Sequence, residues 1–449
     1  MTETPDRPEE DIVFEDTQED EVEIGHSFTP MHFDTMQRKV KDLMSDYIDG
    51  DLDPRPSFQR GYVWDKKRAS RLVESILLNV PLPLVYTAEE EDQTEVVIDG
   101  QQRLLSVFGF ITGKFPKDGS GFKLSGLKLL EQLNGKDFKS LEDKERKAIQ
   151  RYIFQIIRIS NNSHPDVKFE IFERLNSGSV TLNAQELRNC VYRGTFNDTL
   201  RELANFNDFK KMLGTSTVSN RMQDSELVLR FLAFYEKTYL NYSSGMKSFL
   251  NEFMHEYRNP SKEKTASFEN AFKQAASMSF SIFGENAFRK FSVGTAADPG
   301  GSWERPINRP LFDIVMWGFT RFEKNQIMKH SDEIRNAFIE LTTTDSQFID
   351  AITSATGDKG KTQFRFEVWH ERLKAIVQSS TQTRVFPASL KKKLFEYDPT
   401  CSICSQQIHS LDDAHVDHIV PFSKGGATTE DNAQIAHRYC NLRKSSSSQ

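Results

Sequence analysis

The chain has 449 residues, of which 37% are hydrophobic and 27% are charged. This length allows two or three domains, each able to bury a core of its own. No stretch approaches the roughly 20 consecutive apolar residues of a membrane-spanning helix, and we expect no membrane partner. We expect no signal peptide, because the N-terminus is acidic. Four cysteines, three of them near a histidine, favour a metal site in a reducing compartment, so we expect a cytoplasmic protein.

The net charge of −7 is unevenly distributed along the chain. Residues 1–25 hold eleven carboxylates and one arginine, a charge of −10, so the remainder carries +3 and a nucleic-acid partner is not excluded. We interpret residues 1–25 as an acidic disordered leader. The alternative is a decoy that occupies a DNA channel until nucleic acid displaces it.

Strands and helices alternate in the first part of the chain. Hydrophobic spacing predicts, in chain order, a helix over 36–48, a helix capped by Asp65, strands over 84–87 and 95–98, a helix over 102–111 closed by Gly113, a strand over 152–159 and a helix over 167–175. This alternation indicates an α/β domain over residues 26–190.

The pattern becomes mainly helical over residues 191–385. Segments 226–239, 247–257 and 267–283 have helical spacing, and the main interruption is the loop 298–310, which is rich in Gly and Pro. We predict a helical middle domain here, followed by a small C-terminal domain over residues 386–449.

Two pairs of soft metal ligands lie in the C-terminal domain. Cys401 and Cys404 form a Cys-x-x-Cys pair, and His437 and Cys440 form a His-x-x-Cys pair 33 positions later. This spacing predicts a tetrahedral Zn²⁺ site that supplies much of the stability of a unit of about fifty residues. The alternative is a set of buried thiols without metal.

Between and beside these pairs lie residues suited to cutting a phosphodiester. A histidine can take a proton from water near neutral pH. A hard divalent ion, Mg²⁺ or Mn²⁺, can stabilise the phosphate and the leaving oxygen, and it prefers oxygen ligands. Asp417 and Asn441 could provide two such ligands.

The same residues resemble the HNH (ββα-metal) endonucleases over roughly residues 395–446. The string 415–421 (HVDHIVP), the glycines at 425–426, Asn432 and the motif 440–444 (CNLRK) carry this resemblance. One departure is His437, where many zinc-bearing members have cysteine.

The resemblance implies a role for each catalytic residue. It makes His418 the general base and Asp417 and Asn441 the catalytic metal ligands, and it makes Asn432 the residue that steadies the histidine and the loop. Arg443 and Lys444 would touch DNA phosphates, with exposed solvated charges as the alternative.

A second candidate site follows the predicted strand 95–98. The string 99–103 (DGQQR) stands where a strand passes into a helix, so backbone N–H groups can receive a phosphate there. Gly100 permits close approach of a phosphate to the backbone, and Arg103 can donate two hydrogen bonds to its oxygens. Asp99 could hold a metal or a water, which Gln101 and Gln102 could orient.

Residues 30–195 resemble the N-terminal half of the GmrSD-type restriction proteins, whose fold is like ParB and sulfiredoxin. The DGQQR string is the most specific part of the resemblance. The resemblance implies nucleoside triphosphate binding and hydrolysis at 99–103, with Gln59, Arg60 and Asn176 lining the same pocket. It also implies defence against phage or foreign, often modified, DNA.

The expected fold class is therefore α/β plus mainly helical, with a ParB/sulfiredoxin-like N-terminal domain, a helical middle and a zinc-stapled HNH domain. The favoured function is a conditional, modification-dependent and nucleotide-regulated endonuclease that cuts double-stranded phage DNA. The alternatives are a nucleotide-responsive DNA-binding regulator whose zinc module only grips DNA, and an enzyme that acts mainly on nucleotides. A homo-oligomer is left open.

Overall fold

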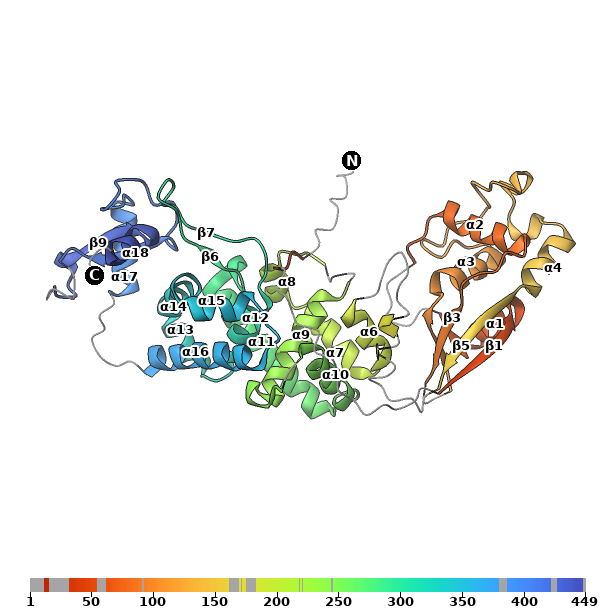
Figure 1. Cartoon of the computed structure of the whole chain (residues 1–449), viewed down its shortest axis with the longest axis horizontal. Coiled ribbons are helices and arrows are strands. Elements are labelled where there is room, and N and C mark those ends of the chain that lie inside the picture. The colour runs from red at the N-terminus through yellow and green to blue at the C-terminus, as the bar shows by residue number, and fades with distance from the viewer. Residues whose placement is uncertain are drawn as a thin grey trace. The chain divides into compact units, whose positions relative to one another are not determined.

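The computed structural model describes residues 12–15, 32–54, 62–90, 93–160, 169–170, 172–174, 183–217, 219, 221–243, 245–378, 386–420 and 426–446. They form two compact units (Figure 1). One unit comprises residues 24–197 with 254–258, and the other comprises the remainder of the chain. No helix in the described part of the chain combines the length and the apolar character that a membrane span requires.

The N-terminal unit is built on a five-stranded sheet with the order β1-β5-β3-β4-β2. Its strands are β1 (Phe33–Lys39), β2 (Leu52–Asp53), β3 (Val85–Glu89), β4 (Glu95–Asp99) and β5 (Ile153–Ile159). The pairs β1–β5 and β3–β4 are antiparallel, whereas β3–β5 and β2–β4 are parallel. The unit is therefore a mixed α/β domain.

The helices of this unit agree with most of the sequence predictions. They are α1 (Val40–Asp49), α2 (Lys66–Leu77), α3 (Gln101–Thr112), α4 (Asp143–Arg151) and α6 (Ala184–Val191), with 3-10 turns η1 (Glu131–Leu133) and η2 (Phe138–Ser140). The Asp65 side chain accepts a bond from the N–H of Arg68, which confirms it as the cap of α2. Gly113, with φ 78°, ends α3 as predicted.

The helix predicted over residues 36–48 is wrong in its first turn. Residues 36–39 belong to β1, which pairs with β5 from Phe33 opposite Ile159 to Lys39 opposite Ile153. The helical spacing of the apolar residues begins within the strand, and pairing with a segment about 120 residues away overrides it. The helix predicted over 167–175 lies partly outside the described residues.

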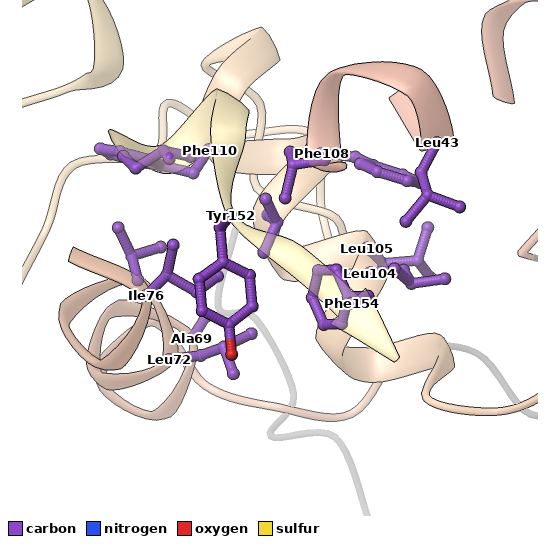
Figure 2. Close-up of a cluster of buried hydrophobic side chains, with 14 of the residues drawn as sticks. Leu43, Ala69, Leu72, Ile76, Leu104, Leu105, Phe108, Phe110, Tyr152 and Phe154 are labelled. Atoms are coloured by element: carbon purple, nitrogen blue, oxygen red, sulfur yellow. The ribbon is translucent and has the colours of Figure 1, made fainter. Parts of the chain in front are cut away.

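Aromatic and aliphatic side chains from α1, α2, α3, α4 and the strands β2 to β5 fill one core in the N-terminal unit. Figure 2 shows Phe108 and Phe110 of α3 among the side chains of this cluster, with Ile76 of α2, Leu43 of α1 and Phe154 of β5. Burial of each such side chain contributes roughly 1.5–3 kcal/mol. This core holds the end of β4 and the start of α3, where the DGQQR string lies, on rigid elements.

The middle of the chain is mainly helical. Its elements are α7 (Thr195–Ala204), α8 (Asn207–Leu213), α9 (Gln223–Lys237), η3 (Tyr239–Asn241), α10 (Met246–Glu256), α11 (Lys262–Phe283), η4 (Gly284–Asn286), β6 (Phe291–Ser292), β7 (Ser302–Trp303), α12 (Arg309–Phe319), α13 (Lys324–Lys329), α14 (Ser331–Thr344), α15 (Ser346–Thr353) and α16 (Lys359–Gln378). The three predicted helices are confirmed as α9, α10 and α11. The predicted loop 298–310 contains β7, which pairs with β6 in a short hairpin.

Residues 12–15 of the acidic leader are ordered against the helical part, so the expectation of disorder is wrong for this segment. Phe14 pairs with Ile307 as an isolated β-bridge. The Glu15 carboxylate accepts bonds from Lys290 Nζ at 2.7 Å and from Asn308 Nδ2 at 2.9 Å. Backbone pairing and a salt bridge thus compensate for the low hydrophobicity of the leader.

The C-terminal module consists of α17 (Ala388–Tyr397), β8 (Ala414–His418), η6 (Glu430–Asn432), β9 (Ala433–His437) and α18 (Arg438–Ser446). The strands β8 and β9 form an antiparallel hairpin, and α17 and α18 pack against both strands. This is the strand–strand–helix arrangement that the sequence predicted for residues 386–449.

A group of charged side chains holds this module against the helical part of the same unit. Asp412, just before β8, accepts two bonds from Arg335 of α14, one of them at 2.6 Å, and one from Trp303 Nε1 of β7 at 2.8 Å. Lys391 Nζ and Arg438 Nη2 both donate to Asn336 Oδ1, at 3.0 and 2.8 Å. The nuclease-like module is therefore docked by directed polar contacts, which the sequence did not predict.

Candidate functional site

Four metal-binding side chains come together in the C-terminal module. Their donor atoms lie within 4.8 Å of one another, and the residues are Cys401, Cys404, His437 and Cys440. His437 Nδ1 lies 3.4 Å from Cys404 Sγ, whereas Nε2 lies 3.3 Å from the carbonyl oxygen of Gln407. Nδ1 thus faces the thiols, and an Nε2–H that donates to the carbonyl would fix this tautomer, as is usual for zinc-bound histidine.

The thiols of this cluster favour a bound cation. Burial alone would raise the pKa of Cys401, but backbone N–H groups of three nearby residues bring its pKa down to about 7. Burial and the neighbouring thiols raise the pKa of Cys440 to about 12. A positive ion is needed to hold several thiolates together, and three thiols with one imidazole suit Zn²⁺.

The β8–β9 hairpin presents Asp417 to two donors. Gln434, its cross-strand partner, donates from Nε2 to Asp417 Oδ2 at 2.9 Å. Lys444 Nζ donates to the same oxygen at 2.6 Å and to the carbonyl of His418 at 3.1 Å. The ammonium group of Lys444 thus lies on the Asp417 carboxylate, which shows that this position accommodates a positive charge.

His418 follows Asp417 at the end of β8 and is held on two sides. Its Nε2 lies 3.1 Å from Thr428 Oγ1. The buried ring of Phe386, two residues before α17, lies 4.4 Å from the imidazole, centroid to centroid, at an interplanar angle of 41°. The hydroxyl and the aromatic ring together restrict the orientation of the imidazole.

Helix α18 carries Asn441 and packs against β8. Asn441 and Lys444 are three residues apart on α18 and therefore share a face of the helix. Because Lys444 reaches Asp417, this face is turned towards β8. The neighbouring Arg443 is exposed. The structure thus brings Asp417, the carbonyl of His418 and Lys444 of α18 together.

The side chain of Asn432 forms hydrogen bonds with the backbone of the loop between β8 and β9. Its Oδ1 accepts the N–H of Val420 at 2.9 Å, and its Nδ2 donates to the carbonyls of Val420 and Ala427 at 3.1 and 2.9 Å. These bonds clamp the two ends of a loop whose middle, 421–425, lies outside the described residues. Asn432 therefore orients backbone at the end of β8, directly after His418.

His415 lies two residues before Asp417 in β8. Burial, together with the charges of Arg438 and Lys391, lowers the pKa of His415 to about 4. The imidazole is therefore neutral near pH 7, and it faces the docking contacts around Arg438 and Lys391. This placement is typical of a structural histidine.

The DGQQR string lies where β4 passes into α3. Gly100 has φ 102°, and a Cβ at this position would lie 2.8 Å from a methyl carbon of Val85, so the turn requires glycine. Arg103 donates to Asp99 Oδ2 at 2.5 Å and to the carbonyl of Pro83. The carboxylate and the guanidinium therefore lie side by side at the start of α3.

The two glutamines of this string have different surroundings. Gln102 Oε1 accepts the N–H groups of Val63 at 3.0 Å and Trp64 at 3.4 Å, which ties α3 to the segment that leads into α2. Gln101 is buried and accepts a bond from Gln102 Nε2 at 3.3 Å. The predicted pocket residues Gln59, Arg60 and Asn176 lie outside the described part of the chain.

Three residues next to the nuclease-like centre were not predicted. Gln434 could have been found from strand pairing, because it stands opposite Asp417 in the hairpin. Thr428 lies in the polar segment after the two glycines, which gives only a weak signal. Phe386 has no local signal, since the packing of α17 on the hairpin brings its ring to His418.

Comparison with protein-family models matches two parts of the chain. Residues 40–193 match the model described as GmrSD restriction endonuclease, N-terminal domain, and residues 401–447 match the model described as HNH endonuclease. No curated protein matches the chain. The two matches cover the DGQQR string and the whole zinc-ligand cluster.

Proposed function

We propose that this chain, a GmrSD-type protein that carries an HNH endonuclease domain, is a conditional restriction endonuclease that cuts double-stranded DNA in defence against phage. The observation that carries this proposal is that Lys444, which shares a face of α18 with Asn441, contacts Asp417 and the carbonyl of His418 in a module that also holds a Cys/His cluster. We place its action in the cytoplasm, where free thiols persist.

His418 activates water in this proposal. If Nε2–H donates to Thr428 Oγ1, the neutral imidazole keeps its basic lone pair on Nδ1. An imidazole in this state can accept a proton from water near neutral pH and contributes roughly 10²–10⁴-fold to the rate. Asn432 and Phe386 hold the strand end and the ring, so the base does not have to be reoriented during the reaction.

Asp417 and Asn441 would hold a divalent ion, Mg²⁺ or Mn²⁺, which when bound supplies positive charge to the scissile phosphate and the leaving oxygen. A divalent ion bound at Asp417 would displace the ammonium of Lys444 from this carboxylate. Lys444 and the exposed Arg443 then contact phosphates flanking the cut. The four Cys/His ligands hold Zn²⁺ for structure alone, because they use all four positions of a tetrahedral site.

His418→Ala tests the catalytic assignment. The variant should lose cutting of phage DNA in Mg²⁺ or Mn²⁺ by at least 100-fold, which is the low end for loss of a general base, while it keeps zinc and DNA binding. His409→Ala is the matched control, because His409 is exposed in the same module and lies outside the centre. Unchanged cutting by His418→Ala would remove His418 as the base, and loss of DNA binding as well would favour a module that only grips DNA.

In this proposal, nucleotide binding and hydrolysis at the DGQQR string determine whether the protein cuts DNA. A nucleoside triphosphate would place its phosphates at the start of α3, where backbone N–H groups and Arg103 can receive them. We propose that this pocket hydrolyses the nucleotide and that recognition of modified DNA is coupled to this step. The paired Asp99 and Arg103 support the assignment, because the carboxylate keeps the guanidinium at the entrance of the turn.

Arg103→Ala tests this part separately from cutting. Release of phosphate from each nucleoside triphosphate should fall by at least tenfold in the variant, with zinc content unchanged. The same preparations, incubated with modified and unmodified phage DNA with and without nucleotide, test whether cutting depends on either condition. Equal hydrolysis by variant and parent would exclude the DGQQR pocket as the hydrolytic site.

A further inference from the structure

A concave surface lies on the N-terminal unit and contains no residue of the DGQQR string. It encloses about 510 Å³, and its lining residues are Lys66, Gly121, Lys123, Leu124, Ser125, Gly126, Asn134 and Gly135. We call this surface the α2 groove. Its walls are the first turn of α2 and the loops that follow α3.

Cationic side chains follow the edge of the α2 groove. Lys66 Nζ donates to the carbonyl of Gly121 at 3.2 Å, and Arg71 Nε donates to the carbonyl of Gly126 at 3.3 Å. Lys67 packs beside Gly126, and Lys123 stands exposed in the lining of the groove. Lys67 and Arg71 are one helical turn apart, so positive charge extends along the helix and is not confined to one point.

Carboxylates near this edge accept hydrogen bonds from backbone donors, and two of them, Asp118 and Asp137, also interact electrostatically with Lys66 and Lys123, respectively. Asp65 accepts the N–H of Arg68 at 2.7 Å, and Asp118 accepts the N–H of Ser120 at 2.9 Å. The buried Glu74 accepts three successive N–H groups of the loop at 2.7 to 3.0 Å. Within the described chain, no carboxylate forms an ion pair with Lys66, Lys67 or Lys123.

The floor of the α2 groove allows close approach of an anion. Gly126 and Gly135 have φ of 67° and 84°, a backbone conformation that favours glycine, and neither has a side chain to shield the backbone. The lining polar groups of Ser125 and Asn134 add hydrogen-bonding capacity. A phosphate group is the anion that this combination of lysines and small residues fits.

The α2 groove is physically connected to the DGQQR helix. The guanidinium of Arg68 lies 4.5 Å from the ring of Trp64, and the backbone N–H of Trp64 donates to Gln102 of α3. The segment that begins α2 is therefore held by a residue of the proposed nucleotide pocket. A shift of α3 would move the cationic edge of the groove.

We propose that the α2 groove binds the sugar–phosphate backbone of DNA, so that the N-terminal unit holds the substrate at a place distinct from the cutting centre. An extended polyanion is favoured over a free nucleotide because the cations run along a helix edge. This inference rests on the proposed function only in taking DNA as the substrate. It adds the surface through which DNA engages the domain that bears the DGQQR string.

The test is DNA binding by the full-length protein without added divalent metal. A fluorescein-labelled duplex of mixed sequence is titrated with parent, Lys66→Gln/Lys123→Gln and the control Lys41→Gln/Lys144→Gln, which removes the same charge from exposed sites of α1 and α4. Fluorescence anisotropy is measured from 50 to 300 mM salt. Loss of two phosphate contacts should weaken binding roughly tenfold near 0.15 M salt and reduce the salt slope by about 2, whereas the control should match the parent. Lys123→Gln alone provides a variant that leaves the Lys66 contact to the loop intact.

Several outcomes would overturn the proposal. Binding and salt slope equal to those of the parent would exclude the α2 groove as a DNA surface. An equal loss in the control would show a non-specific effect of net charge, and weaker binding of labelled nucleoside triphosphate without weaker DNA binding would show a small-anion site. Failure of the proposed function is distinguishable, because His418→Ala reports on cutting and leaves this binding assay unaffected.

Discussion

The N-terminal unit buries 25 described side chains in its main core, whereas the largest buried cluster of the C-terminal module holds six, two of which are the thiols of Cys401 and Cys440. The first domain can therefore fold through apolar burial. The second has too little apolar surface to do so and must gain free energy from metal binding and from its contacts with the helical part. A substitution that destabilises one region should therefore leave the stability of the other region largely unchanged, and this can be tested.

Cys440→Ser is expected to have the largest effect. Structural zinc is worth on the order of 10 kcal/mol in small modules, so the variant should lose its metal and unfold in the C-terminal module. Metal analysis and a thermal scan would show loss of one zinc per chain and of one transition, with the transition of the N-terminal unit retained. Cys190→Ser is the matched control: Cys190 is buried in the N-terminal unit, and this variant should keep its zinc.

Phe110→Ala is the converse change in the other region. Phe110 is fully buried and packs edge-on against Phe122 and Phe138. Its truncation should destabilise the N-terminal unit by about 3–5 kcal/mol, because the cavity cannot collapse completely. Denaturant unfolding should show this loss while zinc content stays constant. A simultaneous loss of zinc would show that the two regions do not fold independently.

Gly100→Ala tests the turn between β4 and α3 in the N-terminal unit. A side chain at φ 102° is strained, and its Cβ would clash with Val85. We expect a destabilisation of the N-terminal unit by about 1–3 kcal/mol, together with weaker nucleotide binding. Chemical unfolding and nucleotide titration of the same sample measure both effects. Gly113→Ala serves as control, because Gly113 also has positive φ but no neighbouring atom lies within 4 Å of the place that a Cβ would take.

Lys391 should make the stability of the C-terminal module depend on pH. Burial lowers the pKa of Lys391 to about 7, assisted by Arg438 and Arg335 and opposed by Asp412 and Asp332. Between about pH 7 and the unfolded pKa of 10.5, the unfolded chain binds a proton that the folded chain does not. Stability should therefore rise with pH over this window, by up to about 1.4 kcal/mol per pH unit, and the dependence should vanish below it.

Lys391→Met is the variant that isolates this contribution. Unfolding of the zinc-loaded protein at pH 7.0 and 8.5 should show a larger gain in stability for the parent than for Lys391→Met. Equal gains would mean that Lys391 stays protonated in the folded module and that the contact with Asn336 is made by an ammonium at both pH values.

The sequence allowed prediction of features that depend on local spacing. Two ligand pairs give the metal cluster, and Asp65 and Gly113 mark the ends of helices. Features that depend on distant pairing were missed or misjudged. Residues 36–39 form a strand only because β5 lies beside them, and Phe386 reaches His418 only because α17 packs on the hairpin.

The roles of the candidate residues were harder to predict from the sequence than their identities. The resemblance to the HNH endonucleases indicated Asp417 and His418, but the contacts of Gln434 and Thr428 with them follow from the hairpin geometry. In the DGQQR string, the residue types suggested two glutamines that orient a ligand. The structure buries Gln101 and uses Gln102 to hold the start of α2, which no local pattern could indicate.

Arg438 follows the zinc ligand His437 directly and reaches out of the module to Asn336 on α14. The residue that anchors the module therefore directly follows a residue of the metal cluster. If the C-terminal module unfolds when its metal is removed, the contact between Arg438 and Asn336 should be lost with it, so metal removal should also detach the module from the helical part.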